Sequence, residues 1–184
     1  PNAILLIKDT GAALRYARQA AHAWLEELKR IDARFPHSPY LADHLAHWYH
    51  MLCHSVRARD HKPLYREYAA EVKRWGAEAV RRSPHNADLR SAYGSHLLQT
   101  TRLKPGKERI PIYEAALKQF ELARQMGPLL PPFYSRCQYT LNQLARLHDA
   151  AGRTEQAAAY RREAEKVAEQ KRKLRQARWN IGLS

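Results

Sequence analysis

Apolar side chains recur at intervals of three or four residues in seven stretches of the chain. This spacing places them on one face of an α-helix, so each stretch predicts an amphipathic helix. The first apolar stripe consists of Leu14, Ala17, Ala21, Trp24, Leu28 and Ile31. The seven expected helices span residues 10–34, 39–59, 64–82, 87–101, 112–126, 133–150 and 154 to beyond 168.

Residues that interrupt helices separate these stretches. Pro36, Pro84 and the sequence GPLLPP at residues 127–132 cannot continue a helix. Residues 102–111 predict a basic loop, and a short turn is expected at residues 2–8. Ser38 is the expected N-cap of the second helix. Gly152 stands at a turn where positive φ is needed.

Composition agrees with an all-α protein. Glycine is scarce, at 7 residues, whereas strong helix formers are abundant. The 184 residues are enough for one domain with a real core, and an apolar content of 45% argues against disorder. The longest early apolar run, residues 4–7, is far shorter than the ~20 residues of a membrane span. Cys53 and Cys137 lie far apart, which predicts two free buried thiols.

One stretch has a more specific pattern. Within residues 113–128, the small Ala116, the large Phe120 and the small Ala123 are followed by Pro128. This pattern resembles the second helix of a tetratricopeptide repeat. Looser copies of the pattern occur in other helices, so the resemblance covers roughly residues 31–169.

The resemblance implies an all-α fold of antiparallel helix hairpins, stacked as a short right-handed α-solenoid. It implies one helical-repeat domain with a capping helix at 1–36, hairpins at 37–84, 85–128 and 129–169, and a basic extension at 170–184. Because Pro36, Pro84 and Pro128 are 48 and 44 residues apart, a HEAT- or armadillo-type solenoid is the alternative fold. Since the chain begins with Pro1, we interpret it as part of a longer protein, from the cytoplasm or the periplasm.

In this family the first helix of each hairpin lines a concave groove that binds peptides. The resemblance therefore gives a set of predicted groove residues: Tyr40, Asp43, His44, His47, Asp88, Ser91, Ser95, Tyr139, Asn142, Gln143 and Arg146. Family members that grip an acidic C-terminal carboxylate use Lys, Arg and Asn at such places. Asp43 and Ala92 stand at two of them here, so a groove for another kind of peptide is expected.

Histidines are concentrated in the second expected helix, which contains His44, His47, His50 and His54. His50 and His54 are one turn apart, a spacing that suits Zn²⁺ or Ni²⁺. Because we expect the four histidines to wrap around the helix, and the HExxH motif is absent, no metal site is predicted. His50 and His54 are kept only as the candidate pair, and a polar groove wall is the preferred interpretation.

Basic residues outnumber acidic ones, 32 to 18, and give a net charge of +14. This charge favours acidic peptides, nucleic acid or an anionic membrane surface as partners. Solvated basic helix faces would give the same total. A C-terminal basic patch is predicted from Lys171, Arg172, Lys173, Arg175 and Arg178, and a second basic spot from Lys104 and Lys107.

The sequence contains no glycine-rich phosphate loop, GxSxG motif or convergent pair of acids. We therefore predict no cofactor and no enzymatic activity for this region. The expected function is a scaffold that binds proteins or peptides through a concave groove. The alternatives are a basic nucleic-acid-binding helical domain and the soluble helical-repeat domain of a bacterial membrane polysaccharide ligase or polymerase.

Overall fold

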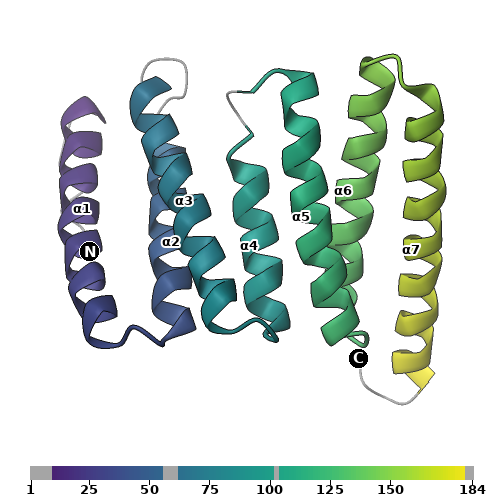
Figure 1. The fold of residues 1–184 in the computed structure, drawn as a ribbon, viewed down its shortest axis with the longest axis horizontal. Helices are drawn as coiled ribbons and strands as arrows, with labels where there is room; N and C mark the ends of the chain where they lie inside the picture. Colours follow the sequence, from purple (N-terminus) through teal and green to yellow (C-terminus); the bar gives the residue numbers. More distant parts are fainter. Residues whose placement is uncertain (1–9, 56–61, 102–103, 181–184) are drawn as a thin grey trace. The chain divides into compact units, whose positions relative to one another are not determined.

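A computed structural model of the protein describes residues 10–55, 62–101 and 104–180. These residues form seven α-helices and no strand, which confirms the predicted all-α class (Figure 1). None of these helices combines the length and apolar character that crossing a bilayer requires. The helices are α1 (Thr10–Arg34), α2 (Pro39–Ser55), α3 (Lys62–Arg82), α4 (Ala87–Gln99), α5 (Gly106–Met126), α6 (Pro131–Ala150) and α7 (Thr154–Asn180).

The chain divides into two compact units, Pro1–Arg82 and Ser83–Ser184. In the first unit α2 packs against α1 and α3, and in the second each helix packs against the next one along the chain. Neighbouring helices within a unit run antiparallel, so the helix hairpin is the building element (Figure 1). Residues 170–180, expected as an extension, are the last turns of α7. The single-domain organisation stays a prediction.

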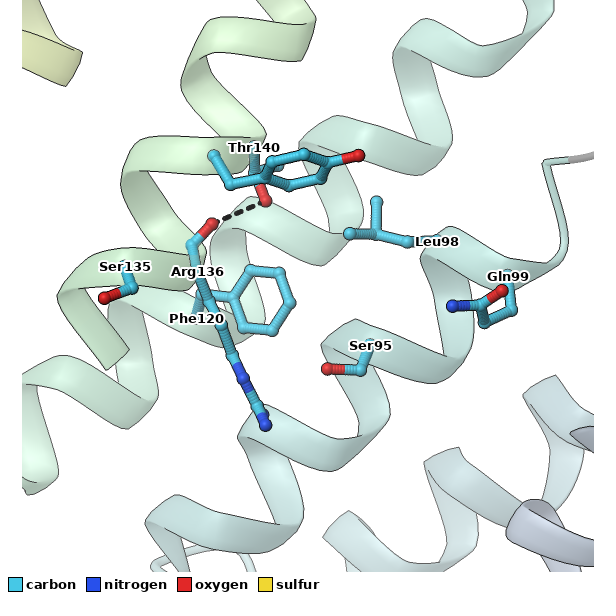
Figure 2. A pocket seen from close by; sticks show the side chains of 8 residues that line it. Ser95, Leu98, Gln99, Phe120, Ser135, Arg136 and Thr140 are labelled. Atoms are coloured by element: carbon cyan, nitrogen blue, oxygen red, sulfur yellow. Dashed lines mark hydrogen bonds between the residues drawn. The ribbon is translucent and has the colours of Figure 1, made fainter. Parts of the chain in front are cut away.

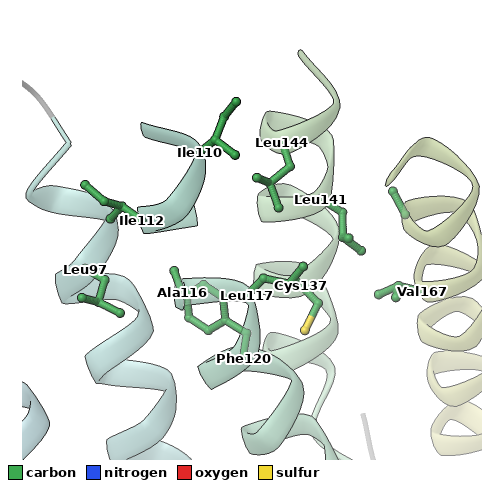
Figure 3. Packing of buried hydrophobic residues seen from close by; sticks show 11 residues of the cluster. Leu97, Ile110, Ile112, Ala116, Leu117, Phe120, Cys137, Leu141, Leu144 and Val167 are labelled. Atoms are coloured by element: carbon green, nitrogen blue, oxygen red, sulfur yellow. The ribbon is translucent and has the colours of Figure 1, made fainter. Parts of the chain in front are cut away.

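The core of the second unit is built on the small-large-small pattern of α5. Ala116, Phe120 and Ala123 are all at most 1% exposed. The Phe120 ring lies so close to Gly94 of α4 that a Cβ on this glycine would stand 2.6 Å from ring atom Cε1. Small residues therefore let α4 and α5 approach closely, as the repeat pattern predicts. Figure 3 shows the surrounding cluster, which includes Leu97, Ile110, Leu141, Leu144 and Val167.

The first helix buries a different face from the predicted one. Trp24 is 46% exposed, whereas its neighbour Leu25 is completely buried. The buried positions at the end of α1 are Leu28, as expected, and Asp32, which is 6% exposed. Asp32 is buried because Arg82 of α3 pairs with its carboxylate, a partner that the local pattern does not reveal. The side chains of Leu14 and Ala17, the turn at 2–8 and the end of the second helix at 56–59 lie outside the described residues.

The predicted basic loop at 102–111 is wrong for its second half. Helix α5 begins at Gly106 and contains Pro111. Pro111 is the sixth residue of the helix and lies just past its first turn, so its missing N–H removes one intrahelical hydrogen bond. Burial of Ile110 and Ile112 on either side stabilises this extra turn.

Other local predictions agree with the structure. Gly152 has φ of +74°, and Ser38 Oγ accepts a 3.4 Å hydrogen bond from the amide of Leu41. Cys53 and Cys137 are both buried, and both are thiols rather than halves of a disulfide. Burial raises the pKa of the Cys137 thiol to about 12, so this sulfur stays protonated and behaves as a core side chain.

Candidate functional site

A cavity of about 260 Å³ lies in the second unit among α4, α5 and α6 (Figure 2). We call it the α4–α6 cavity. Each of the three helices contributes to its wall, so the cavity depends on how they pack together. Its lining residues are Ser95, Leu98 and Gln99 of α4, Phe120 of α5, and Ser135, Arg136, Tyr139 and Thr140 of α6.

The close approach of α4 and α5 gives the cavity its floor. The Phe120 ring lies against Gly94, where a larger residue would push it away. Phe120 is 1% exposed, and Tyr139 at the opening is 54% exposed. One aromatic ring therefore forms the base of the cavity and another is available to a ligand from solvent.

The hydroxyl groups around the cavity are already engaged within their own helices. Ser95 Oγ donates to the Ser91 carbonyl at 3.0 Å. Thr140 Oγ1 donates to the Arg136 carbonyl at 2.8 Å (Figure 2). Ser135 Oγ similarly donates to the carbonyl of Pro131, at 3.2 Å. The O–H donors of these side chains are therefore satisfied, and their oxygens can still accept hydrogen bonds.

Arg136 is the one charged side chain among the residues that line the cavity. Its Nη1 donates to Ser91 Oγ of α4, and Ser91 is 1% exposed. This hydrogen bond fixes the guanidinium between α4 and α6. The remaining guanidinium N–H groups can bind a carboxylate at the rim.

The structure places the predicted groove residues in both units. Ser95 and Tyr139 line the α4–α6 cavity, and Ser91 lies behind it through its bond with Arg136. The others of the second unit do not line the cavity: Asp88 is exposed on the first turn of α4, and Asn142, Gln143 and Arg146 follow Tyr139 on α6. In the first unit, α2 carries Tyr40, Asp43, His44 and His47, of which all but Asp43 are exposed.

Sequence reasoning missed six of the lining residues: Leu98, Gln99, Phe120, Ser135, Arg136 and Thr140. Helical spacing contains part of the missing signal. Arg136 lies three residues before Tyr139, and Leu98 and Gln99 lie three and four residues after Ser95, so each shares a helix face with a predicted residue.

The histidines of α2 do not wrap around the helix as expected. His47, His50 and His54 lie within roughly 60° of one another around the helix axis, and His44 lies roughly 60° from His47, so the four share one broad side of the helix. The Nε2 atoms of His50 and His54 are 2.8 Å apart and share a hydrogen bond, and the His47 and His50 rings lie 6.2 Å apart. Within the described parts of the chain, no group of three or more His, Cys, Asp or Glu side chains is placed to hold a metal ion.

The C-terminal basic patch lies on the last turns of α7. Arg172 and Lys173 both pair with Glu169, at 2.8 and 3.8 Å, and Arg175 is exposed. The hydrogen bond from Arg172 lowers the pKa of the Glu169 carboxyl. Lys171 is half-buried, and the side chain of Arg178 lies outside the described residues.

The second basic spot is at the start of α5. Lys104 lies 3.8 Å from Glu108, and Lys107 is exposed on the first turn of the helix. The C-terminal basic patch therefore lies at the end of α7, whereas the second basic spot lies at the start of α5.

No protein-family model matches the chain, and no curated protein matches it. Among solved structures, the chain is similar to one described as MamA MSR-1 C2, with 15% sequence identity and a TM-score of 0.47. The alignment covers 90% of this chain and 83% of that chain. A likeness at this level carries no argument about function.

Proposed function

We propose that the chain is a non-catalytic helical-repeat module that binds a peptide segment of another protein in the α4–α6 cavity. The observation that carries the proposal is the cavity itself, an apolar hollow with an exposed tyrosine and one guanidinium. Its 260 Å³ is slightly less than the ~300–1,000 Å³ typical of small-molecule pockets. The space suits one or two anchoring side chains of a peptide rather than a complete cofactor.

The lining residues favour a particular kind of peptide. Phe120, Leu98 and the Tyr139 ring offer apolar surface to an aliphatic or aromatic anchor. Arg136 at the rim favours an acidic residue close to that anchor. A net charge of +14 acts in the same direction, because it attracts acidic partners over longer distances.

Peptide selection from a random phage-displayed library against the 184-residue chain tests this proposal. Selected peptides should combine an apolar anchor with an acidic neighbour. Their Kd, measured by fluorescence anisotropy, should rise at least about tenfold for Tyr139→Ala, because truncating an aromatic contact residue of a binding site costs roughly 2 kcal/mol. Arg136→Gln should remove the preference for the acidic neighbour.

Two exposed residues outside the cavity provide matched controls. Tyr16 on α1 is 61% exposed, and Arg162 on α7 is exposed. Tyr16→Ala and Arg162→Gln should leave the Kd unchanged. The proposal fails if no peptide is enriched, or if Tyr139→Ala and Tyr16→Ala weaken binding equally while circular dichroism shows both variants folded.

Nucleic-acid binding is the second candidate, and the net charge of +14 is the observation that favours it. Phosphate contacts make such binding steeply dependent on salt. We expect any RNA or DNA complex to weaken sharply as salt concentration rises. Absence of binding to an oligonucleotide at low salt removes this candidate.

A further inference from the structure

The turn between α5 and α6 exposes a run of apolar residues. We call residues 127–132 the GPLLPP turn: residues 127–130 connect α5 to α6, and Pro131 and Pro132 are the first two residues of α6. Leu129 is 69% exposed and Leu130 43%, and Met126 just before the turn is 37% exposed. Single exposed apolar side chains are normal on protein surfaces, but a contiguous group of them marks an interaction site.

Hydrogen bonds hold the GPLLPP turn in this shape. The amides of Gly127 and Leu130 donate to Ala123 and Gly127 carbonyls, at 2.9 and 3.1 Å. Tyr134 Oη donates to the Pro128 carbonyl at 2.8 Å. The turn is therefore ordered with its two leucines outward, so a partner that covers them orders little additional chain.

The basic end of α7 lies at the same end of the second unit. Arg124, in the last turn of α5, donates to Oε1 of Gln170 on α7 at 2.6 Å. Because α7 runs antiparallel to α6, its last turns are level with the first turn of α6 and with the GPLLPP turn (Figure 1). Residues 169–175 contain four basic residues and one acid, a net charge of +3.

We propose that this end of the second unit docks on an anionic membrane surface. Leu129 and Leu130 would enter the boundary between headgroups and acyl chains, while Lys171, Arg172, Lys173 and Arg175 contact anionic headgroups. Apolar insertion combined with electrostatic attraction is the means by which proteins lie on a bilayer without crossing it. Each basic residue near an anionic leaflet adds to the affinity, and the two leucines add apolar burial.

The exposed leucines of the turn favour a membrane over a nucleic acid as the binding partner. Phosphate oxygens of RNA or DNA would pair with the basic residues but would leave Leu129 and Leu130 in water. A bilayer satisfies both groups at once. The inference does not depend on peptide binding, because neither Leu129 nor the basic residues line the α4–α6 cavity.

Vesicle co-sedimentation of the 184-residue chain tests the proposal. We expect binding to vesicles of phosphatidylcholine mixed equally with phosphatidylserine, and little binding to phosphatidylcholine alone. The double variant Leu129→Ser/Leu130→Ser should bind the mixed vesicles at least about tenfold more weakly. The double variant Lys173→Gln/Arg175→Gln should bind the mixed vesicles more weakly by a similar factor. Its remaining affinity should depend less on salt concentration.

Two control variants with matching substitutions distinguish binding through this surface from binding driven by the overall positive charge. Lys104→Gln/Lys107→Gln removes the same charge at the start of α5, and Phe35→Ser removes an apolar side chain that is 61% exposed in the first unit. Both should bind vesicles like the unaltered chain. Equal binding to both vesicle types overturns the proposal, as does an equal loss in control and test variants. If the leucine variant keeps full affinity and the Lys173/Arg175 variant loses affinity for an RNA oligonucleotide instead, the surface is a nucleic-acid site.

Discussion

Asp32 and Arg82 form an almost completely buried ion pair, with 9% and 7% of their side chains exposed. They lie 50 residues apart in the sequence and join α1 to the end of α3. Arg82 also donates to Glu78 Oε1 at 2.8 Å and to the Ser38 carbonyl at 2.9 Å. Because these contacts satisfy the guanidinium on several sides, removing one partner leaves a buried charge incompletely compensated.

We expect Asp32→Ala to lower the free energy of unfolding of the first unit by about 3 kcal/mol, as breaking a buried pair does. Urea denaturation followed by circular dichroism measures this loss. Glu26→Ala is the control, since Glu26 forms an exposed pair with Lys29 at 2.8 Å and should cost less than ~1 kcal/mol. Equal losses in the two variants would contradict the buried pair's importance.

Glu78 makes the stability of the same unit depend on pH. Hydrogen bonds from Arg81 and then Arg82 lower the pKa of its carboxyl from 4.5 to about 2. A lowered pKa stabilises the folded state above pH 4.5, and this contribution is lost as pH falls from 4.5 towards 2. The difference in unfolding free energy between the original chain and Glu78→Gln should therefore be greatest near neutral pH and shrink through this range. A difference that stays constant with pH would refute the assignment.

At the scale of helices, local sequence patterns correctly predicted buried residues where residues close together in the sequence determine the packing. Ala116, Phe120 and Ala123 could be assigned to the core because their small and large side chains alternate within one helix. Local patterns failed for Trp24 and Leu25, because they do not reveal the contacts of α1 with distant parts of the chain, of which the pairing of Asp32 with Arg82 is one.

The candidate site shows the same limit. The α4–α6 cavity exists only because α4, α5 and α6 pack together. Its rim is fixed by a bond between Arg136 and Ser91, which are 45 residues apart. The resemblance to tetratricopeptide repeats indicated which helices would line a groove, so Ser95 and Tyr139 could be named, and helical spacing predicts which residues share a face with them. Helical spacing does not show which faces meet, and Arg136 and Phe120 were therefore missed.

Gly94 of α4 lies directly against Phe120 of α5, so a side chain added at Gly94 would disturb the contact between the two helices. Gly94→Ala would place a Cβ 2.6 Å from Phe120 Cε1. The resulting overpacking costs about 1–3 kcal/mol, and alanine's better helix propensity returns roughly 1 kcal/mol. We expect thermal denaturation to show a net loss of up to about 2 kcal/mol, partly recovered when Phe120→Leu is added.

Gly106 provides the control for this substitution. The nearest atom to a Cβ at Gly106, Cδ2 of Leu147, is 3.9 Å away, an ordinary contact. Gly106→Ala should therefore leave stability unchanged or raise it slightly. A destabilisation equal to that of Gly94→Ala would show that the close approach of α4 and α5 is not the cause.

At the scale of the molecule, each unit has its own source of stability. The cluster that contains Leu97, Phe120, Leu141 and Val167 belongs entirely to Ser83–Ser184. The Asp32–Arg82 pair belongs entirely to Pro1–Arg82. A segment of about 100 residues with a contiguous core is large enough to fold alone.

We therefore expect residues 83–184, expressed separately, to show helical circular dichroism and a cooperative thermal transition. In the 184-residue chain, Asp32→Ala should lower the transition temperature of the first unit and leave that of the second unchanged, because the substitution removes no contact from the cluster. Hydrogen exchange read by mass spectrometry separates the two units by peptide. Two outcomes would contradict this expectation: residues 83–184 fail to fold alone, or Asp32→Ala weakens protection from hydrogen exchange equally around Phe120 and around Arg82. Either outcome would mean that the two units unfold as one cooperative structure, as the single domain predicted from the sequence implies.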